Sequence, residues 1–165
     1  MDCDLLLKDF LLKIGGSTID DKLGWANFID SRVVDFLLEH GKQFPTEGLE
    51  CLAHTPFPDY RLPLGRVHCH KNCVDLRCYV GTGRSEYQIV HGWALSTNDT
   101  WYCHSWCLKR TGPENIIETT CPRISYFGFV VPDEVDPRAI LFVPSNLGDQ
   151  LENWKFGRLQ AIRAQ

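Results

Sequence analysis

The feature that most constrains the fold is a series of short strand-like segments between residues 86 and 131. The segments "EYQIVHGWAL", "WYCHSWCLK" and "NIIETTC" are rich in aromatic and β-branched residues, and the links "STNDT" and "RTGPE" have turn chemistry. Strands joined by such short links pair as an antiparallel meander. Two further strands are predicted for "ISYFGFVV" and "AILFVP". The sequence therefore predicts an antiparallel sheet as the centre of the molecule.

Helical patterns flank this region on both sides. Apolar spacing predicts one helix over residues 4–13, and a long helix over 17–39 that is either continuous or divided near Gly24. Residues 44–65 contain four prolines and predict an irregular connection. Ser145 is expected to cap a final helix. The apolar side of that helix would be formed by Leu147, Leu151, Trp154, Leu159 and Ile162.

The length of 165 residues is usual for one domain, and 44% hydrophobic residues are enough to bury a core. We expect a single α+β domain in which an antiparallel sheet packs against helices. Its parts are N-terminal helices (1–43), a proline-rich connection (44–65), a core with catalytic-like motifs (66–132), and a strand with a C-terminal helix (133–165).

Charge and compartment limit the possible partners. The formal net charge is -4 and no lysine- or arginine-rich run occurs, which argues against nucleic acid as a partner. No apolar stretch approaches the length of a membrane span, and Lys8 and Asp9 interrupt the N-terminal apolar run, unlike a signal peptide. We therefore expect a cytoplasmic protein without membrane partners, whose eight cysteines are reduced. The sequence does not predict an oligomeric state.

The stretch "GRVHCHKNCVDL", residues 65–76, is the first candidate for chemistry. The preceding "LPLG" cannot lie inside a helix, so a helix that begins near His68 places Cys69 at its start. A helix N-terminus favours an anion through its N–H groups and its dipole. Cys69 is therefore a candidate thiolate nucleophile.

A strand histidine is the candidate base. Side chains alternate along "YCHSWCL", so His104 lies on the face opposite its two cysteine neighbours. A hairpin turn centred near Thr111 and Gly112 would place Glu118 directly across from His104, where a carboxylate would orient the imidazole. A register slip of one residue would put Thr119 there instead.

The order "CHKN", "HSW", "IIETTCP" and "SYFGF" resembles small papain-like cysteine hydrolases over about residues 66 to 130. The wider papain and transglutaminase-like superfamilies use the same chain order. The resemblance implies a papain-like core with the nucleophile at a helix N-terminus. It also implies that Cys69 is the nucleophile, His104 the base and Glu118 the third member of a triad.

One position departs from the papain pattern. Papain has a glutamine shortly before its nucleophile that helps to form the oxyanion hole, and "RLPLGRVH" contains none. The oxyanion hole would need a second hydrogen-bond donor besides the N–H of Cys69, and the candidates are His68, His70 and Asn72. Trp93 and Trp106 are candidates to line the substrate.

The expected activity is attack on an amide, isopeptide or thioester carbonyl through an acyl-enzyme, as in a peptidase, amidase or protein deamidase. With an amine in place of water, the same chemistry is transglutamination. The expected substrate is a protein or peptide, and no cofactor or metal is expected.

Two other interpretations remain open. The first is a non-catalytic binding or inhibitor domain whose cysteines fill the core. The second is a zinc-stabilised domain that uses two C-x3-C pairs with nearby histidines. The zinc interpretation requires a helix over "WYCHSWCLK", because Cys103 and Cys107 on a strand would lie about 13 Å apart.

Overall fold

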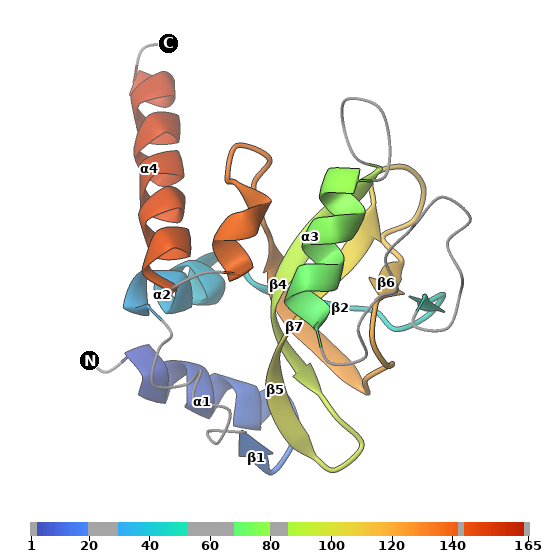
Figure 1. The fold of residues 1–165 in the computed structure, drawn as a ribbon. Helices are drawn as coiled ribbons and strands as arrows, with labels where there is room; N and C mark the ends of the chain where they lie inside the picture. Colours follow the sequence, from blue (N-terminus) through green and yellow to red (C-terminus); the bar gives the residue numbers. More distant parts are fainter. Residues whose placement is uncertain (1–2, 20–29, 53–67, 80–85, 142–143, 164–165) are drawn as a thin grey trace.

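The computed structural model describes residues 3–19, 30–52, 68–79, 86–141 and 144–163 (Figure 1). Its elements in chain order are α1 (Cys3–Ile14), β1 (Thr18–Ile19), α2 (Ser31–His40), β2 (Lys42–Phe44), β3 (Glu50–Cys51), α3 (Cys69–Tyr79), β4 (Tyr87–Leu95), β5 (Thr100–Lys109), β6 (Ile116–Glu118), β7 (Ser125–Val130), the 3-10 helix η2 (Pro137–Leu141) and α4 (Pro144–Arg163).

The strands form one mostly antiparallel sheet of seven strands, and the expected α+β class is confirmed. The strand order is β2-β7-β4-β5-β6-β3, and β1 pairs in parallel with β5 beside this path. The long hairpin of β4 and β5 is the centre of the sheet. The strand β7 pairs with β4 rather than with β6, so the meander covers only β4 to β6.

The two faces of the sheet bury different cores. The residues Ile89 and Trp93 of β4 face a large core that also contains buried side chains of α1, α2, α3 and α4. In Figure 1, α1, α2 and α4 lie to one side of the central strands and α3 lies in front of them. The opposite face holds a smaller core of Phe44, Val90, Ala94, Trp106, Leu108, Ile116 and Tyr126. This alternation follows from the two-residue period of strand side chains.

The expected helix over residues 4–13 is confirmed by α1, and the expected strands from residue 86 to 131 are confirmed by β4 to β7. The long helix over 17–39 is wrong at its start. Thr18 and Ile19 extend as β1, opposite Thr100 and Trp101 of β5. The helix α2 begins only at Ser31, after Asp30, whose carboxylate accepts from the N–H of Arg32. The position near Gly24 lies outside the described residues.

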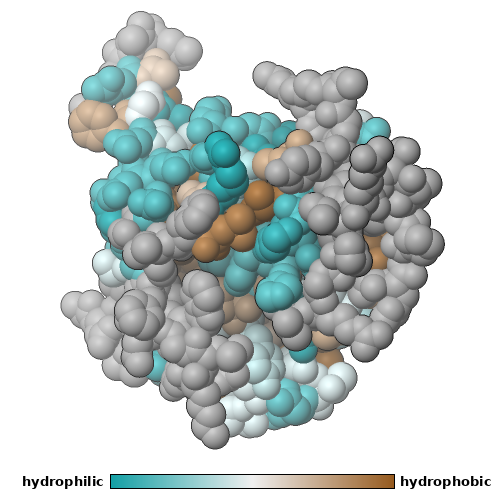
Figure 2. All heavy atoms as spheres, viewed as in Figure 1, coloured by the Kyte–Doolittle hydropathy of each residue, from teal (hydrophilic) through white to brown (hydrophobic). Residues whose placement is uncertain are grey.

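The C-terminal region also differs from expectation. The strand predicted for "AILFVP" is wrong, because the described part of this segment belongs to η2. The helix α4 begins at Pro144, so Ser145 is inside it. Leu147 and Leu151 are buried, but Leu159 and Ile162 are 53% and 69% exposed. Figure 2 shows hydrophobic side chains on this projecting end of α4.

The segment predicted as an irregular connection contains short strands at its start. The strand β2 ends at Phe44 and β3 follows at Glu50, while residues 53–65 lie outside the described ranges. Across the helices that the structure describes, none is both long enough and apolar enough to cross a bilayer.

Candidate active site

Cys69 is the first residue of α3, as the sequence predicts. The N–H of Asn72 donates to the carbonyl oxygen of His68 at 2.8 Å, which closes the first turn. The N–H of Cys69 belongs to this turn, where the helix itself supplies no acceptor. The thiol and a backbone donor therefore lie together at the positive end of the helix dipole.

His104 and Glu118 form a buried pair beside this helix end. The Nε2 atom of His104 lies 2.9 Å from Oε2 of Glu118, and the residues are 2% and 0% exposed. An ionised carboxylate only accepts hydrogen bonds, so Nε2 carries the proton and donates it. The second ring nitrogen, Nδ1, is left for the contact of His104 with Cys69.

This pair forms although the register differs from the predicted one by two residues. The described ladder pairs Cys107 with Ile117 and Leu108 with Ile116, whereas the prediction set His104 opposite Glu118. A shift of two residues leaves every side chain on its face, while a shift of one would reverse it. The two side chains therefore meet diagonally across the strands rather than directly.

The carboxylate of Glu118 accepts four hydrogen bonds. Besides His104, it accepts from the N–H of Thr120 at 2.8 Å, the hydroxyl of Thr120 at 2.9 Å and the hydroxyl of Tyr126 at 2.9 Å. Burial alone raises the pKa of Glu118, but the hydrogen bond from His104 and the charge of that ring lower it overall. Glu118 is therefore an anion that holds His104 in one tautomer and one orientation.

The thiol of Cys69 lies close enough to two imidazoles, those of His104 and His70, for both to lower its pKa. Burial raises the pKa of Cys69, but these two contacts outweigh it and lower the pKa to about 5. Burial lowers the pKa of His104, but the hydrogen bonds to Cys69 and Glu118 raise it to about 9. Near neutral pH the pair is therefore a thiolate and an imidazolium.

The second imidazole belongs to a polar chain that the sequence analysis did not find. The Nδ1 atom of His70 lies 2.8 Å from the hydroxyl of Ser105, and Nδ1 of His91 lies 3.0 Å from the same hydroxyl. Cys103 also raises the pKa of His70. Ser105 lies on the strand face opposite His104, so the two imidazoles that interact with Cys69, His70 of α3 and His104 of β5, lie toward opposite faces of β5. This is possible because the stretch 102–106 lies between the β5 pairings with β1 and β6.

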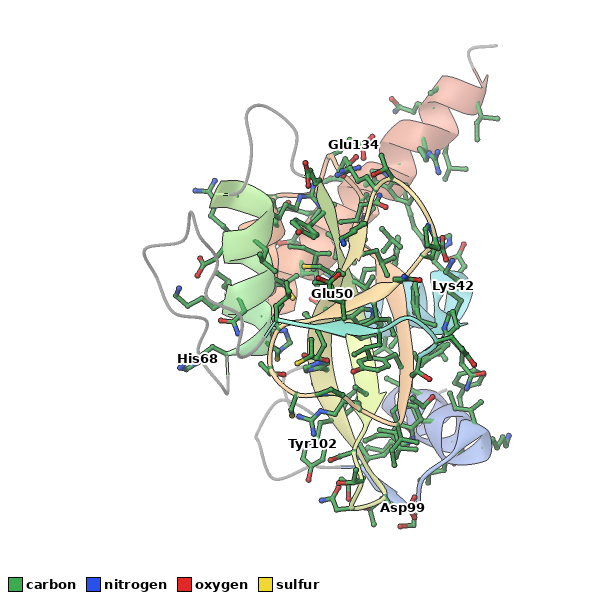
Figure 3. The ribbon with its side chains drawn as sticks, turned by 90° about the vertical axis from the view of Figure 1, so that its right-hand side faces the viewer. Lys42, Glu50, His68, Asp99, Tyr102 and Glu134 are labelled. Carbon is green, nitrogen blue, oxygen red and sulfur yellow. The ribbon has the colours of Figure 1, made fainter. Side chains whose placement is uncertain are left out.

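The other expected site residues have different surroundings. The side-chain amide of Asn72 donates to the carbonyl of Thr119 at 3.1 Å, which ties α3 to the segment after Glu118. His68 is exposed, and Figure 3 shows it pointing away from the sheet at the start of α3. Trp93 and Trp106 are buried in the two separate cores, and the Trp106 ring stacks on His104 with centroids 6.1 Å apart. The roles in binding substrate that the sequence predicts for these four residues stay predictions.

The zinc interpretation lacks the geometry that it requires. The segment with Cys103 and Cys107 is a strand, so the two side chains cannot clamp one ion. In the described ranges, no group of three or more His, Cys, Asp or Glu side chains is arranged to hold a metal ion.

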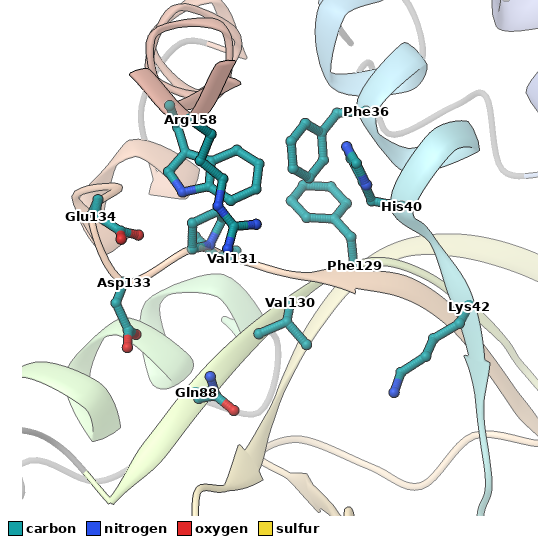
Figure 4. A pocket seen from close by; sticks show the side chains of 12 residues that line it. Phe36, His40, Lys42, Gln88, Phe129, Val130, Val131, Asp133, Glu134 and Arg158 are labelled. Atoms are coloured by element: carbon teal, nitrogen blue, oxygen red, sulfur yellow. The ribbon is translucent and has the colours of Figure 1, made fainter. Parts of the chain in front are cut away.

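A pocket of about 320 Å³ lies elsewhere, between α2, α4 and the end of β7 (Figure 4). Its apolar wall includes Phe36, Phe129 and Trp154, and its rim includes the charged residues Lys42 and Arg158. None of the residues that contact Cys69 lines this pocket.

Comparison of the chain with protein-family models, with curated proteins and with solved structures gives no match in any of the three.

Proposed function

We propose that this chain is a cysteine hydrolase with a papain-like core, acting on an amide, isopeptide or thioester through an acyl-enzyme. One observation supports the proposal above all others. The buried pair of His104 and Glu118 is directed at the thiol of Cys69, which begins a helix. A nucleophile, a base and a group that orients the base are the parts that covalent acyl transfer requires.

In the first half of the reaction, the thiolate of Cys69 attacks the carbonyl carbon and forms a carbon–sulfur bond. The electron pair of the carbonyl moves to its oxygen, and the resulting oxyanion is stabilised by the N–H of Cys69 in the first turn of α3. The intermediate collapses to a thioester on Cys69. The departing amine or thiol takes the proton from Nδ1 of His104, which becomes neutral.

In the second half, neutral His104 accepts a proton from water as the oxygen attacks the thioester. Collapse of this second intermediate breaks the carbon–sulfur bond and releases the acid together with the thiolate. Glu118 stays ionised throughout, because it stabilises the imidazolium rather than receiving its proton. The proposed substrate is a protein or peptide, and an amine in place of water would give transamidation.

Selective labelling of Cys69 tests the proposal. At pH 6 the full chain is treated with a limiting amount of an iodoacetamide probe, and the labelled cysteines are found by peptide mass spectrometry. We expect labelling of Cys69, because its pKa of about 5 makes it a thiolate at this pH. The Cys69→Ala variant should lose the label and keep its circular dichroism spectrum.

Cys78→Ala is the matched control, because Cys78 is exposed on the same helix and burial raises its pKa. This variant should label like the parent. Equal labelling of Cys69→Ala and the parent would contradict the proposal.

Acylation by a small activated thioester then tests the role of His104. Intact-protein mass spectrometry should show one acyl group on the parent, with turnover on longer incubation. His104→Gln should slow turnover about a hundredfold or more, because general acid–base catalysis contributes at least that factor.

A further inference from the structure

We infer that His70 is a second catalytic imidazole of this site, which Ser105 and His91 hold in place so that it stabilises negative charge first on the sulfur of Cys69 and then on the oxyanion. This inference rests on the proposed function and extends it. It gives the Cys69 sulfur two imidazole partners, His104 from β5 and His70 from α3, where a triad has one.

The geometry is a continuous chain of polar contacts. His70 follows Cys69 directly on α3, and the two side chains interact strongly enough to shift the pKa of each other. The hydroxyl of Ser105, which is 0% exposed, lies 2.8 Å from Nδ1 of His70 and 3.0 Å from Nδ1 of His91. The two rings have centroids 5.4 Å apart. His91 and Ser105 are direct partners in the β4–β5 ladder, so the sheet itself fixes the outer half of this chain.

The direction of the hydrogen bonds follows from their donors. A serine hydroxyl has one hydrogen, so it donates to one ring and accepts from the other. Burial and the charges of His70 and His104 lower the pKa of His91 to about 3, so His91 is neutral and accepts at Nδ1. Burial lowers the pKa of His70, but hydrogen bonds to Cys103 and Cys69 raise it to about 10, so His70 donates at Nδ1. Its Nε2–H is then the donor left for the sulfurs.

The titratable groups around the two imidazoles belong to α3, β4, β5 and β6. His70 is faced by Cys69 on its own helix, by Cys103 on β5 and by His91 on β4, and His104 on β5 acts on His91 as well. Glu118 on β6 and the buried thiol of Cys73 on α3 complete the set. Two imidazolium cations thus balance the thiolate and the Glu118 carboxylate at neutral pH.

The two imidazoles have different parts in the reaction. His104 gives its proton to the leaving group and becomes neutral in each cycle. At Nδ1, His70 keeps its proton, because the path there runs through Ser105 to His91, a ring that resists protonation. When the thiolate forms the carbon–sulfur bond and the carbonyl electron pair moves to its oxygen, a fixed cation is therefore still beside the site where the charge develops.

The test is the pH dependence of Cys69 alkylation in the full chain. The rate of iodoacetamide labelling at Cys69 follows the thiolate fraction, so the parent should show a midpoint near pH 5. His70→Gln should raise this midpoint by at least about 1 pH unit, because an opposite charge nearby contributes a shift of this size. Ser105→Ala should raise it in the same direction by less, since it keeps the imidazole but removes its hydrogen-bond partner. His40→Gln, the same change at a distant histidine, should leave the midpoint unaltered.

The outcomes separate this inference from the proposed function. A midpoint unchanged in both His70→Gln and Ser105→Ala, together with a raised midpoint in His104→Gln, would overturn the role of His70 and leave the hydrolase proposal intact. Absence of preferential Cys69 labelling in the parent would instead remove the proposed function. If His70→Gln loses its circular dichroism signal, Ser105→Ala decides alone: a raised midpoint supports the role of His70 and an unchanged one refutes it.

Discussion

Glu118 is a carboxylate without solvent contact, and its stability depends on four donated hydrogen bonds. Three of them come from Thr120 and Tyr126, and the fourth comes from His104. Burying a carboxylate is costly unless donors of this kind replace water. The same contacts that orient the base therefore also make Glu118 important for folding.

We predict that Glu118→Gln lowers the free energy of unfolding by about 3 kcal/mol, because it removes one partner of a buried charged pair. The NH2 group of the glutamine would also place its hydrogen atoms against side chains and an N–H that are themselves hydrogen-bond donors. Urea denaturation at several pH values is the measurement.

The pH dependence of this loss has a defined sign. The lowered pKa of Glu118 adds stability that is present above the ordinary carboxyl pKa of 4.5 and is lost as pH falls through the folded-state value. The raised pKa of His104 adds stability that is complete below 6.5 and is lost as pH rises through about 9. The variant should therefore differ most from the parent between pH 4.5 and 6.5. The control is Glu114→Gln, whose exposed pair with Lys42 should contribute at most about 1 kcal/mol. A difference that stayed the same below pH 4.5 and above about pH 9 as between pH 4.5 and 6.5 would contradict the prediction.

At the residue scale, the candidate site could be predicted from two patterns, which are the alternation of side chains along a strand and the helix-breaking segment before Cys69. Cys69 could be placed from the helix-breaking "LPLG" before it, and His104 and Glu118 needed only the correct face. Ser105 could have been found by the same alternation, since it faces the helices. Its contact with His70 could not, because it depends on how α3 docks on the sheet.

At the scale of elements, the close approach of β4 and β7 is set by two glycines. Gly92 lies opposite Gly128 on β7 and opposite His104 on β5. A Cβ atom on Gly92 would overlap the carbonyl oxygen of Phe127 and lie 2.5 Å from the Cα of Gly128. A side chain there must push β7 away from β4, the strand that neighbours the proposed base His104.

We predict that Gly92→Ala destabilises the protein by about 2 kcal/mol or more, because overlap with backbone cannot be relieved by a rotamer change. It should also slow acylation of Cys69, since β4 supports β5 at His104. Thermal unfolding and the thioester assay are the measurements. Gly157→Ala in α4 is the control: nothing lies within 4 Å of its Cβ, and alanine favours a helix by up to about 1 kcal/mol. An unfolding temperature for Gly92→Ala equal to that of the parent would refute the prediction.

Local patterns predicted elements well where period and turn chemistry agreed, as in β4 and β5. They failed where a short apolar run has no distinctive period. "AILFVP" reads as a strand, but Ala139 and Ile140 pack as a turn of 3-10 helix. The prediction of a helix at Thr18 and Ile19 is wrong because their pairing with β5 joins residues far apart in sequence. A local pattern contains no information about such a pairing.

For the whole molecule, the large core links the N-terminal helix to the candidate site. Leu11 of α1 is 0% exposed and belongs to the same core as Cys73 and Leu76 of α3, the helix that bears Cys69. The Phe10 ring lies 4.7 Å from that of Phe127 on β7, so α1 also contacts the central sheet. The helix α1 should therefore unfold together with the rest rather than as a separate unit.

We predict that Leu11→Ala lowers the free energy of unfolding by about 3 kcal/mol through the cavity that it leaves. Because the core is continuous, tryptophan fluorescence and the accessibility of the Cys73 thiol should report the same shifted transition in urea. Leu12→Ala is the matched control, since Leu12 is 42% exposed on the same helix and its truncation should change stability by less than about 0.5 kcal/mol. Cys73 is the suitable reporter because it is 0% exposed and belongs to that core. If Leu11→Ala shifted only the early part of a two-step transition, with Cys73 protected to the parent's urea concentration, α1 would be an independently unfolding part and the site would not depend on it.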